Sequence, residues 1–397
     1  MKPMRQNPWP DLPRAQHPAP SGVLVIDKPA GVTSHDVVAA LRRLCGTRKV
    51  GHAGTLDPMA TGVLVVGIGA GTRLLTYLSG SDKDYRATFT LGIGSDTEDC
   101  TGTVTSAPGF SGTTAQLDAA LSSLQGDISQ VPSAYSAKKI AGQRAYDLVR
   151  AGQQVVLEAV PIHIARLERS GELRWRQVPV GGVALGGSAL TDGTAALGGS
   201  ALADGAAQFD GAEPVEAQEA AVPVADVDVG VSCSSGTYVR AIARDTGIAL
   251  GSAALMSALR RTRVGGFRQE EAVSIAELAQ LVRGGAQPPV IPLAQVAARA
   301  LPTVQIAAAE AESARHGQFL EARGKTVAPA AGTVSGDAHV AGTAQTDSRA
   351  TGTVPGQAPA AGNEAGTVAL LHGDELVAVA RRHGDSFRPA TVFPPGA

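Results

Sequence analysis

The 397-residue sequence predicts a mixed α+β core followed by a small β-rich C-terminal domain. Three observations favour this class. Short apolar runs typical of buried strands recur between stretches of helical periodicity. After Pro292 the chain offers mainly short strand-like pieces. Gly (48 residues) and Pro (24 residues) are abundant, which indicates a globular protein diluted by small-residue filler.

The first half of the chain is expected to form five elements. They are strands over residues 22–26, 63–68 and 85–93, and helices over residues 34–45 and 114–124. The strands are apolar or alternating runs, and Ser34 is a good N-cap residue for the first helix. Residues 46–61 are rich in Gly and in charge, so we expect a loop there.

The second half continues this mixture. We expect helices over residues 141–150 and 238–250, and strands over residues 155–169, 172–180, 224–233, 301–306 and 367–380. The last two strand-like pieces stand on either side of a low-complexity stretch. They predict the small C-terminal domain.

Two segments, residues 181–221 and 325–366, have the composition of disordered insertions. Leu-Gly-Gly-Ser-Ala-Leu occurs at 185–190 and again at 197–202, and Ala-Gly-Thr and Thr-Gly-Thr units fill the second segment. Neither can bury enough apolar surface to offset its chain entropy. The first would extend the tip of a hairpin.

The net charge of the chain without these two segments differs from that of the whole chain. The formal net charge is −2. The first insertion contributes six acidic residues and no Lys or Arg, and the second contributes −1, so the rest carries +5. A mildly basic globular part is compatible with a phosphate-rich partner.

Other features bear on location. No stretch approaches the ~20 consecutive apolar residues of a membrane helix. Residues 1–20 are Pro-rich, lack the apolar core of a signal peptide and are expected to be a disordered tail. The three widely spaced cysteines (Cys45, Cys100 and Cys233) indicate neither a disulfide framework nor a zinc cluster. We therefore expect a cytoplasmic protein with no membrane association.

Residues 51–64 carry the strongest chemical signal. Asp57 lies in a glycine-rich loop directly before a buried strand. An isolated Asp-Pro is usually a turn whose carboxylate caps its own backbone. Here the glycines permit close approach of a bulky ligand. His52 supplies a donor or acceptor, and Arg48 and Lys49 suit a phosphate backbone.

This segment resembles the catalytic signature Gly-x-Leu-Asp-Pro-x-Ala-x-Gly of the TruB-type pseudouridine synthases, with every fixed position filled from Gly54 to Gly62. Further motifs follow in the family's order. They are Lys28-Pro29, Asp82-Lys-Asp-Tyr85-Arg, Pro132-Ser-Ala-Tyr-Ser-Ala-Lys138, Gly142-Gln-Arg-Ala-Tyr146, Gly236-Thr-Tyr238-Val-Arg240 and Leu259-Arg-Arg. The resemblance spans residues 21–320 and 367–394, apart from the two insertions.

The resemblance implies a fold and a domain division. Residues 21–295 would form a pseudouridine synthase catalytic domain, with a mixed or antiparallel sheet flanked by helices. Residues 296–397 would form a small β-barrel PUA-like domain that binds RNA. Leu259-Arg-Arg would belong to an active-site loop.

The resemblance also implies roles for seven residues. Asp57 would be the catalytic carboxylate, and Arg240 would pair with it and keep it charged. Tyr85 would stack on the uracil ring, and Leu259 would form an apolar wall. His52 would fill the space left by the flipped base or contact its phosphate, while Lys28 and Tyr238 would support the site. Without the motifs, each of the residues other than Asp57 has a ready structural explanation.

The implied reaction breaks the N1–C1′ bond of a uridine, rotates the uracil and rejoins it through C5. It involves no redox change or phosphate activation, so we expect neither a cofactor nor a metal. Asp57 would attack the sugar or the base, or abstract a proton; the sequence leaves these open. By resemblance the substrate is the uridine at position 55 in the T-loop of tRNA. The enzyme would act as a monomer without an obligatory protein partner.

Cations near the matched motifs are candidates for contacts with the phosphates of the T-arm. They are Arg42, Arg43, Arg48, Lys49, Lys138, Lys139, Arg144, Arg150, Arg260, Arg261 and Arg263.

Three other interpretations stay open. The chain could be a relative that works within guide-RNA particles, although Gly142–Tyr146 and the bare N-terminus favour the bacterial form. It could be a non-catalytic RNA-binding or RNA-folding module. It could also be a metal-dependent hydrolase that uses His35, His52 and Asp57, but the expected ligand spacing is missing.

Overall fold

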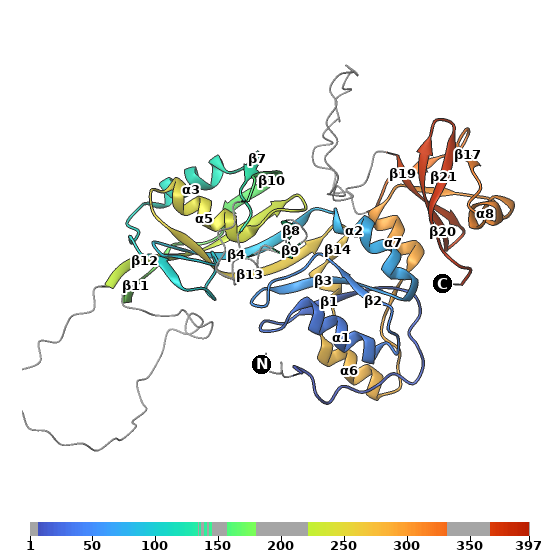
Figure 1. The fold of residues 1–397 in the computed structure, drawn as a ribbon, viewed down its shortest axis with the longest axis horizontal. Helices are drawn as coiled ribbons and strands as arrows, with labels where there is room; N and C mark the ends of the chain where they lie inside the picture. Colours follow the sequence, from blue (N-terminus) through green and yellow to red (C-terminus); the bar gives the residue numbers. More distant parts are fainter. Residues whose placement is uncertain are drawn as a thin grey trace, which may run out of the picture. The chain divides into compact units, whose positions relative to one another are not determined.

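The computed structural model describes residues 7–133, 135, 139–140, 143–144, 157–179, 221–331 and 366–396. The chain divides into two compact units, each assembled from separate stretches of sequence (Figure 1). The first unit contains residues 1–85, 232–235 and 260–397, and the second contains residues 86–231 and 236–259. Both units combine helices with sheet, which confirms the predicted α+β class.

The sheet of the first unit is built around β3 (Thr61–Ile68). The strand β1 (Gly22–Lys28) runs antiparallel to the whole of β3 along one edge. Two strands share the other edge, because β2 (Val50–Ala53) pairs antiparallel with the end of β3 and β13 (Ala254–Val264) pairs parallel with its start. Two short strands extend this sheet, β15 (Ile291–Pro292) beside β1 and β14 (Phe267–Arg268) beside β13.

The side chains of β1 and β3 alternate between two hydrophobic cores, because successive strand residues point to opposite faces. Val23, Val25, Val63 and Val65 enter one core, and Leu24, Ile26, Leu64 and Val66 enter the other. Helices α1 (Ser34–Leu44) and α6 (Ile275–Arg283) contribute to the second core. The helical turn η1 (Gly69–Leu74) and helices α2 (Leu75–Ser79) and α7 (Leu293–Ala300) contribute to the first. Burial on both faces explains why these strands are continuously apolar.

Helix α1 has a different cap from the one predicted. Its N-cap is Thr33, whose Oγ1 accepts a hydrogen bond from the Asp36 N–H (3.2 Å). The Asp36 carboxylate accepts one from the Thr33 N–H (2.8 Å), which completes a capping box. The prediction of Ser34 as the cap was wrong because it overlooked the acidic residue three positions after Thr33.

Residues 1–20 were predicted to be a disordered tail, and for the described residues 7–20 this prediction is wrong. Leu12 is buried in the core beneath α1, and the Arg43 guanidinium donates a hydrogen bond to the Leu12 carbonyl oxygen. The Ala19 N–H donates to the Cys45 carbonyl oxygen (2.9 Å). A Pro-rich stretch without periodicity can still be ordered by single buried side chains and tertiary hydrogen bonds.

The C-terminal part of the first unit forms its own six-stranded sheet. The strand order is β17 (Leu320–Glu321), β21 (Ser386–Val392), β20 (Glu375–His383), β19 (Thr367–His372), β16 (Thr303–Gln305) and β18 (Val327–Ala328). Helix α8 (Ala308–Arg315) packs on it. This curled sheet is consistent with the expected PUA-like domain. The predicted domain boundary between residues 295 and 296 lies inside α7.

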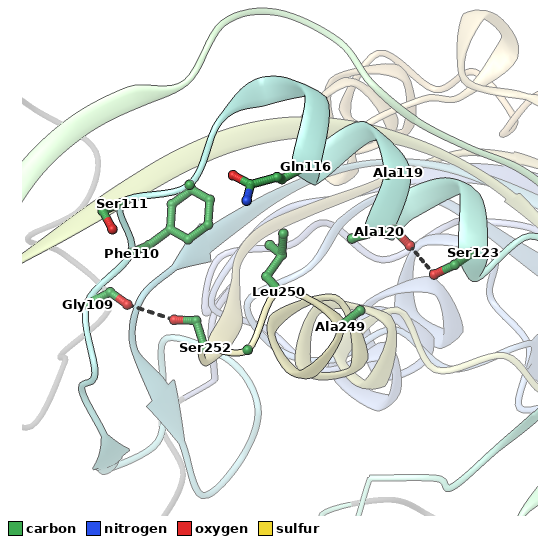
Figure 2. Close-up of a pocket in the computed structure, with 12 residues that line it drawn as sticks. Gly109, Phe110, Ser111, Gln116, Ala119, Ala120, Ser123, Ala249, Leu250 and Ser252 are labelled. Carbon is green, nitrogen blue, oxygen red and sulfur yellow. Dashed lines mark hydrogen bonds between the residues drawn. The ribbon is translucent and has the colours of Figure 1, made fainter.

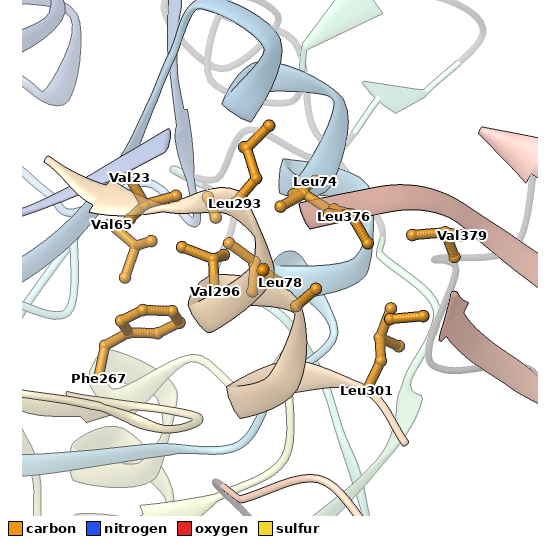
Figure 3. Packing of buried hydrophobic residues seen from close by; sticks show 14 of the residues in the cluster. Val23, Val65, Leu74, Leu78, Phe267, Leu293, Val296, Leu301, Leu376 and Val379 are labelled. Atoms are coloured by element: carbon orange, nitrogen blue, oxygen red, sulfur yellow. The ribbon is translucent and has the colours of Figure 1, made fainter. Parts of the chain in front are cut away.

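One face of this C-terminal sheet packs against the rest of the first unit. Figure 3 shows Leu376 and Val379 of β20 in the same cluster as Leu293, Val296 and Leu301. Polar contacts reinforce the packing: the Arg73 guanidinium donates to the Val392 carbonyl oxygen (2.7 Å), and the hydroxyls of Tyr77 and Thr391 lie 3.0 Å apart.

The second unit contains further strands of the 11-stranded sheet. Its strands lie in the order β4 (Lys83–Leu91), β12 (Ala221–Cys233), β10 (Val160–Arg169) and β7 (Gly126–Gln130), with β11 (Arg174–Pro179) paired to β12. The unit also contains helices α3 (Thr114–Ser123) and α5 (Val239–Ala249). In addition, β5 (Gly94–Ser95) pairs with β6 (Val104–Ser106). The strands β4, β12 and β13 contribute residues to both units.

The two predicted insertions fall almost entirely outside the described residues. Their flanks are informative in the first case, because Pro179 of β11 lies opposite Ala221 of β12 in an antiparallel pair. Residues 180–220 therefore connect two strands of a hairpin, as expected. Disorder in residues 181–220 and 332–365 stays a prediction.

Other differences from the predictions concern elements of mixed composition. Most of the helix predicted over residues 141–150 lies outside the described residues, but Gln143–Arg144 form the short strand β9, paired with β8 (Lys139–Ile140). The predicted loop over 46–61 contains β2, and β13, α6, α7 and α8 were not predicted. None of the described helices is long and apolar enough to cross a membrane.

Candidate active site

Asp57 lies in the loop that joins β2 to β3, at the point where β13 meets β3. Gly62, the last signature residue, has a φ of +96° and lies opposite Arg261 of β13. A Cβ atom at position 62 would be 2.2 Å from the carbonyl oxygen of Arg261. Only glycine fits there, so this signature residue serves the close approach of two strands.

Both neighbours of Asp57 are fixed by contacts from the segment that precedes and begins α1. The Leu56 N–H donates to the Ser34 Oγ (3.0 Å), and this hydroxyl lies 3.3 Å from the Leu56 carbonyl oxygen. The Pro58 carbonyl oxygen accepts from the Gly31 N–H (2.8 Å). Ser34 is thus a residue that fixes the loop, a role that its sequence position alone did not reveal.

Lys28 is fully buried, and its side chain hydrogen-bonds to the same loop. Its ammonium group donates to the carbonyl oxygens of Pro29 (2.8 Å), Val32 (2.8 Å) and Pro58 (3.2 Å). Burial lowers the pKa of Lys28 to about 8, and the nearby Asp57 carboxylate opposes this shift. Lys28 therefore holds the loop that carries Asp57.

Tyr85, at the third position of β4, is 8% exposed. Burial raises the pKa of its phenol to about 12, against the opposing effect of the Arg261 guanidinium. The Asp57 carboxylate contributes to the same upward shift of the pKa. Tyr85 and Asp57 are therefore near enough to influence each other, and the phenol is neutral at ordinary pH.

His52 of β2 is half-buried and its ring packs edge-on against that of His35, with the ring centroids 5.5 Å apart. Within the described part of the chain, the buried Nδ1 atom of His52 has no hydrogen-bond partner. Burial, together with His35 and Arg261, lowers the pKa of His52. This imidazole is therefore neutral at neutral pH.

Arg261 is the site residue whose role was mispredicted. It was expected to contact RNA phosphates, but its side chain is 1% exposed. Its Nε atom donates to the Val63 carbonyl oxygen (2.8 Å) and a terminal nitrogen donates to the Gly54 carbonyl oxygen (3.0 Å). Leu259-Arg-Arg was expected to be a loop, yet it lies on strand β13. The sequence offered no signal for this role, because the strand that carries Arg261 was not predicted.

Leu259, Tyr238 and Arg240 belong to the second unit. Leu259 is 8% exposed on β13, and Tyr238 is the N-cap residue of α5, where its backbone exchanges hydrogen bonds with the Gln130 side chain (2.9 and 3.2 Å). Arg240 is buried, and its guanidinium donates to the carbonyl oxygens of Thr97 and Tyr135 (both 3.1 Å) and lies 3.5 Å from the Asp99 carboxylate. Its pairing with Asp57 stays a prediction.

The other predicted RNA-binding cations differ in their exposure. Arg42, Arg48 and Lys49 are exposed, as a phosphate contact requires. Arg260 forms a two-pronged ion pair with Asp27 (2.9 and 3.0 Å), and Arg263 forms one with Asp84. The side chains of Lys138, Lys139, Arg144 and Arg150 lie outside the described residues.

No group of three or more His, Cys, Asp and Glu side chains in the described ranges could hold a metal ion. A cavity of about 600 Å³ opens in the second unit between the loop 109–112, α3 and the end of α5 (Figure 2). No titratable side chain lines it, so it offers no group for acid–base or nucleophilic chemistry. The Asp57 loop is therefore the candidate active site.

The fold of this chain recurs in solved structures. The fold is similar to that of the crystal structure of a Cbf5-Nop10-Gar1 complex (TM-score 0.57, 22% identity, 98% of this chain and 91% of that chain). It is also similar to an H/ACA RNP bound to a substrate RNA containing 2′-deoxyuridine (TM-score 0.56, 21% identity, 98% and 91%).

Sequence comparison gives the family. Residues 42–177 match the TruB family pseudouridylate synthase N-terminal domain, and residues 240–287 match the tRNA pseudouridylate synthase B C-terminal domain. The chain is 43% identical to tRNA pseudouridine synthase B of Mycobacterium sp. (strain KMS), over 76% of this chain and 85% of that protein. For the protein of the same name from Arthrobacter sp. (strain FB24), the values are 40%, 80% and 88%. The chain belongs to the TruB family of pseudouridylate synthases.

Proposed function

We propose that this enzyme converts the uridine at position 55 of the tRNA T-loop to pseudouridine, with Asp57 as its catalytic carboxylate. The observation that carries the proposal is the Asp57 loop, in which Leu56 and Pro58 are both fixed by contacts from outside the loop. Relatives that share 40–45% identity with the chain are named tRNA pseudouridine synthase B. Preorganisation of this kind suits a group that must meet one atom of a flipped base.

The reaction is an isomerisation, so its atoms balance within the substrate. The N1–C1′ bond breaks, the uracil turns, a C5–C1′ bond forms, and the proton from C5 is lost while N1 gains one. Asp57 would act as the nucleophile or the base in these steps. Tyr85 would stack on the uracil, and its neutral phenol would be available to relay a proton.

The remaining predicted residues would shape the pocket. Arg240 would pair with Asp57, and Leu259 would form an apolar wall. His52 would occupy the space vacated by the base, and its neutral state suits an environment without a counter-ion. Lys28 and Tyr238 would support the site through their backbone contacts.

We further propose that the T-arm of tRNA is the partner and that residues 296–397 add RNA contacts as a PUA-like domain. The enzyme would act as a monomer in the cytoplasm. Sedimentation of the purified protein with and without a tRNA transcript tests the monomer: a 1:1 complex is expected, and a dimer would contradict it.

The function is tested with an unmodified tRNA transcript, with EDTA present and no cofactor added. Carbodiimide-dependent primer-extension stops map pseudouridine at single-nucleotide resolution. We expect a stop at the T-loop uridine with the wild-type protein and with the Asp127→Asn control, which changes an exposed carboxylate. Asp57→Asn should give no stop.

Two outcomes would overturn the proposal. Salt-sensitive tRNA binding by all three proteins without any stop would indicate an RNA-binding module. A stop that persists in Asp57→Asn would show that another group carries the chemistry.

A further inference from the structure

Arg261 connects three parts of the candidate active site. Its guanidinium donates to the carbonyl oxygen of Gly54, where the Asp57 loop leaves β2, and to that of Val63, where the chain has entered β3. The same positive charge opposes the burial that raises the pKa of Tyr85. One buried side chain therefore binds both ends of the loop and acts on the aromatic residue proposed to stack on the substrate.

The charge of Arg261 is unusual for its surroundings. The side chain is 1% exposed, and within the described part of the chain no carboxylate lies within 4.0 Å of its nitrogen atoms. Burying a guanidinium without a carboxylate partner is costly and needs well-placed acceptors. Here the guanidinium donates to two main-chain carbonyl groups, whose positions are thereby tied to Arg261.

This charge also acts on the neighbouring groups of the first unit. Arg261 contributes to lowering the pKa values of Lys28, His52 and Lys83, in each case after burial as the larger cause. The same positive charge favours the ionised form of a nearby carboxylate. The candidate site therefore contains a buried cation that belongs to the first unit itself.

We propose that Arg261 is a positioning residue for the isomerisation: its guanidinium holds the two ends of the Asp57 loop in one arrangement. This inference rests on the proposed function. Arginine suits the task because its planar fork directs several N–H groups at once. A lysine at this position would keep the charge and lose the fork.

The test compares the variants Arg261→Lys and Arg261→Met with the wild type. Single-turnover and steady-state rates on the tRNA transcript separate kcat from KM, filter binding gives the Kd for tRNA, and thermal unfolding gives stability. We expect kcat to fall by about 100-fold in both variants, because a displacement of about 1 Å at the reacting groups has that effect. The Kd for tRNA should stay within about threefold of the wild-type value, since Arg261 is buried.

Two further measurements separate positioning from a loss of stability. The control is Arg299→Met, which removes another arginine of the first unit. Arg299 forms an ion pair with Glu271 and lies over the ring of Phe267. This variant should keep the wild-type kcat at temperatures where it is folded. In a double-mutant cycle, Tyr85→Phe and Arg261→Lys should be non-additive in kcat, because the Arg261 charge acts on the Tyr85 phenol. Arg261→Lys keeps the cycle measurable if Arg261→Met does not fold.

Each outcome decides between distinct explanations. Wild-type kcat in Arg261→Lys would overturn the positioning role and leave only a charge effect. Additive losses in the cycle, or an equal fall of kcat in Arg299→Met, would also overturn it. An inactive wild type would instead refute the proposed function, independently of Arg261.

Discussion

The Nζ atom of Lys28 lies 3.2 Å from the carbonyl oxygen of Pro58, a residue 30 positions away and next to Asp57. The same ammonium group binds the carbonyl oxygens of Pro29 and Val32. A fully buried cation thus joins the end of β1 to the loop that carries the proposed catalytic carboxylate. Its burial has a measurable consequence for stability.

Lys28 should make the stability of the protein depend on pH above neutrality. Its folded-state pKa is about 8, below the value of about 10.4 for an exposed lysine. Between these values the unfolded state binds more protons, so the free energy of unfolding rises with pH, by at most about 1.4 kcal/mol per pH unit. Urea unfolding gives the free energies of unfolding of the wild type and of Lys28→Met at pH 7.5, 8.5 and 9.5. The difference between these two free energies should increase with pH. Parallel curves would contradict this, and Lys49→Met, at an exposed position, is the control.

Gly62→Ala should destabilise the protein strongly. The residue has a φ of +96°, and an added Cβ would be 2.2 Å from the Arg261 carbonyl oxygen, so strain and a backbone clash combine. We expect a loss of about 3 kcal/mol or more in urea unfolding. Gly31→Ala is the matched control, because its φ is +80° but nothing lies within 4 Å of the added Cβ. Its loss should be about 1 kcal/mol. Equal losses would show that the clash relaxes without cost.

Asp99→Asn should destabilise the second unit and impair the site. Asp99 is buried, lies 3.5 Å from the Arg240 guanidinium and accepts hydrogen bonds from Thr97 and Thr101. Removing its charge leaves Arg240 without this counter-ion, at an expected cost of about 3 kcal/mol in unfolding free energy. Asp228→Asn, which breaks a half-exposed pair with Arg174, should cost about 1 kcal/mol or less. A similar small loss in both variants would refute the structural importance of the Asp99–Arg240 pair.

Phe393→Ala should weaken the packing of the C-terminal sheet on the first unit. Phe393 is fully buried in the cluster that contains Leu293 and Val296 of α7. A loss of about 3–5 kcal/mol is expected from differential scanning calorimetry or urea unfolding. Phe319→Ala changes a phenylalanine of the same part of the chain that is 59% exposed, so its effect should stay below about 1 kcal/mol. If both variants behave alike, Phe393 does not hold this sheet in place.

The strands and the main helices were predictable because they express periodicity. The strands β1 and β3 are apolar at nearly every position and α1 has an apolar face, so local pattern and tertiary burial agree. In contrast, β13 carries three arginines within its last five residues, so its sequence lacks the apolar pattern that predicts a buried strand. Its burial is possible because the arginines find ion pairs or main-chain carbonyl groups in the fold.

What the sequence by itself determined is the family, and it singled out Asp57 as the proposed catalytic carboxylate, because the signature from Gly54 to Gly62 is a local pattern with every fixed position present. Only the tertiary structure decided that Lys28, Ser34 and Arg261 hold the loop, since their partners lie 30, 22 and 207 positions away. Sequence cannot tell a buried arginine from an exposed one. The difference comes from which carbonyl oxygens the packing of β13 against β3 brings within reach of the guanidinium.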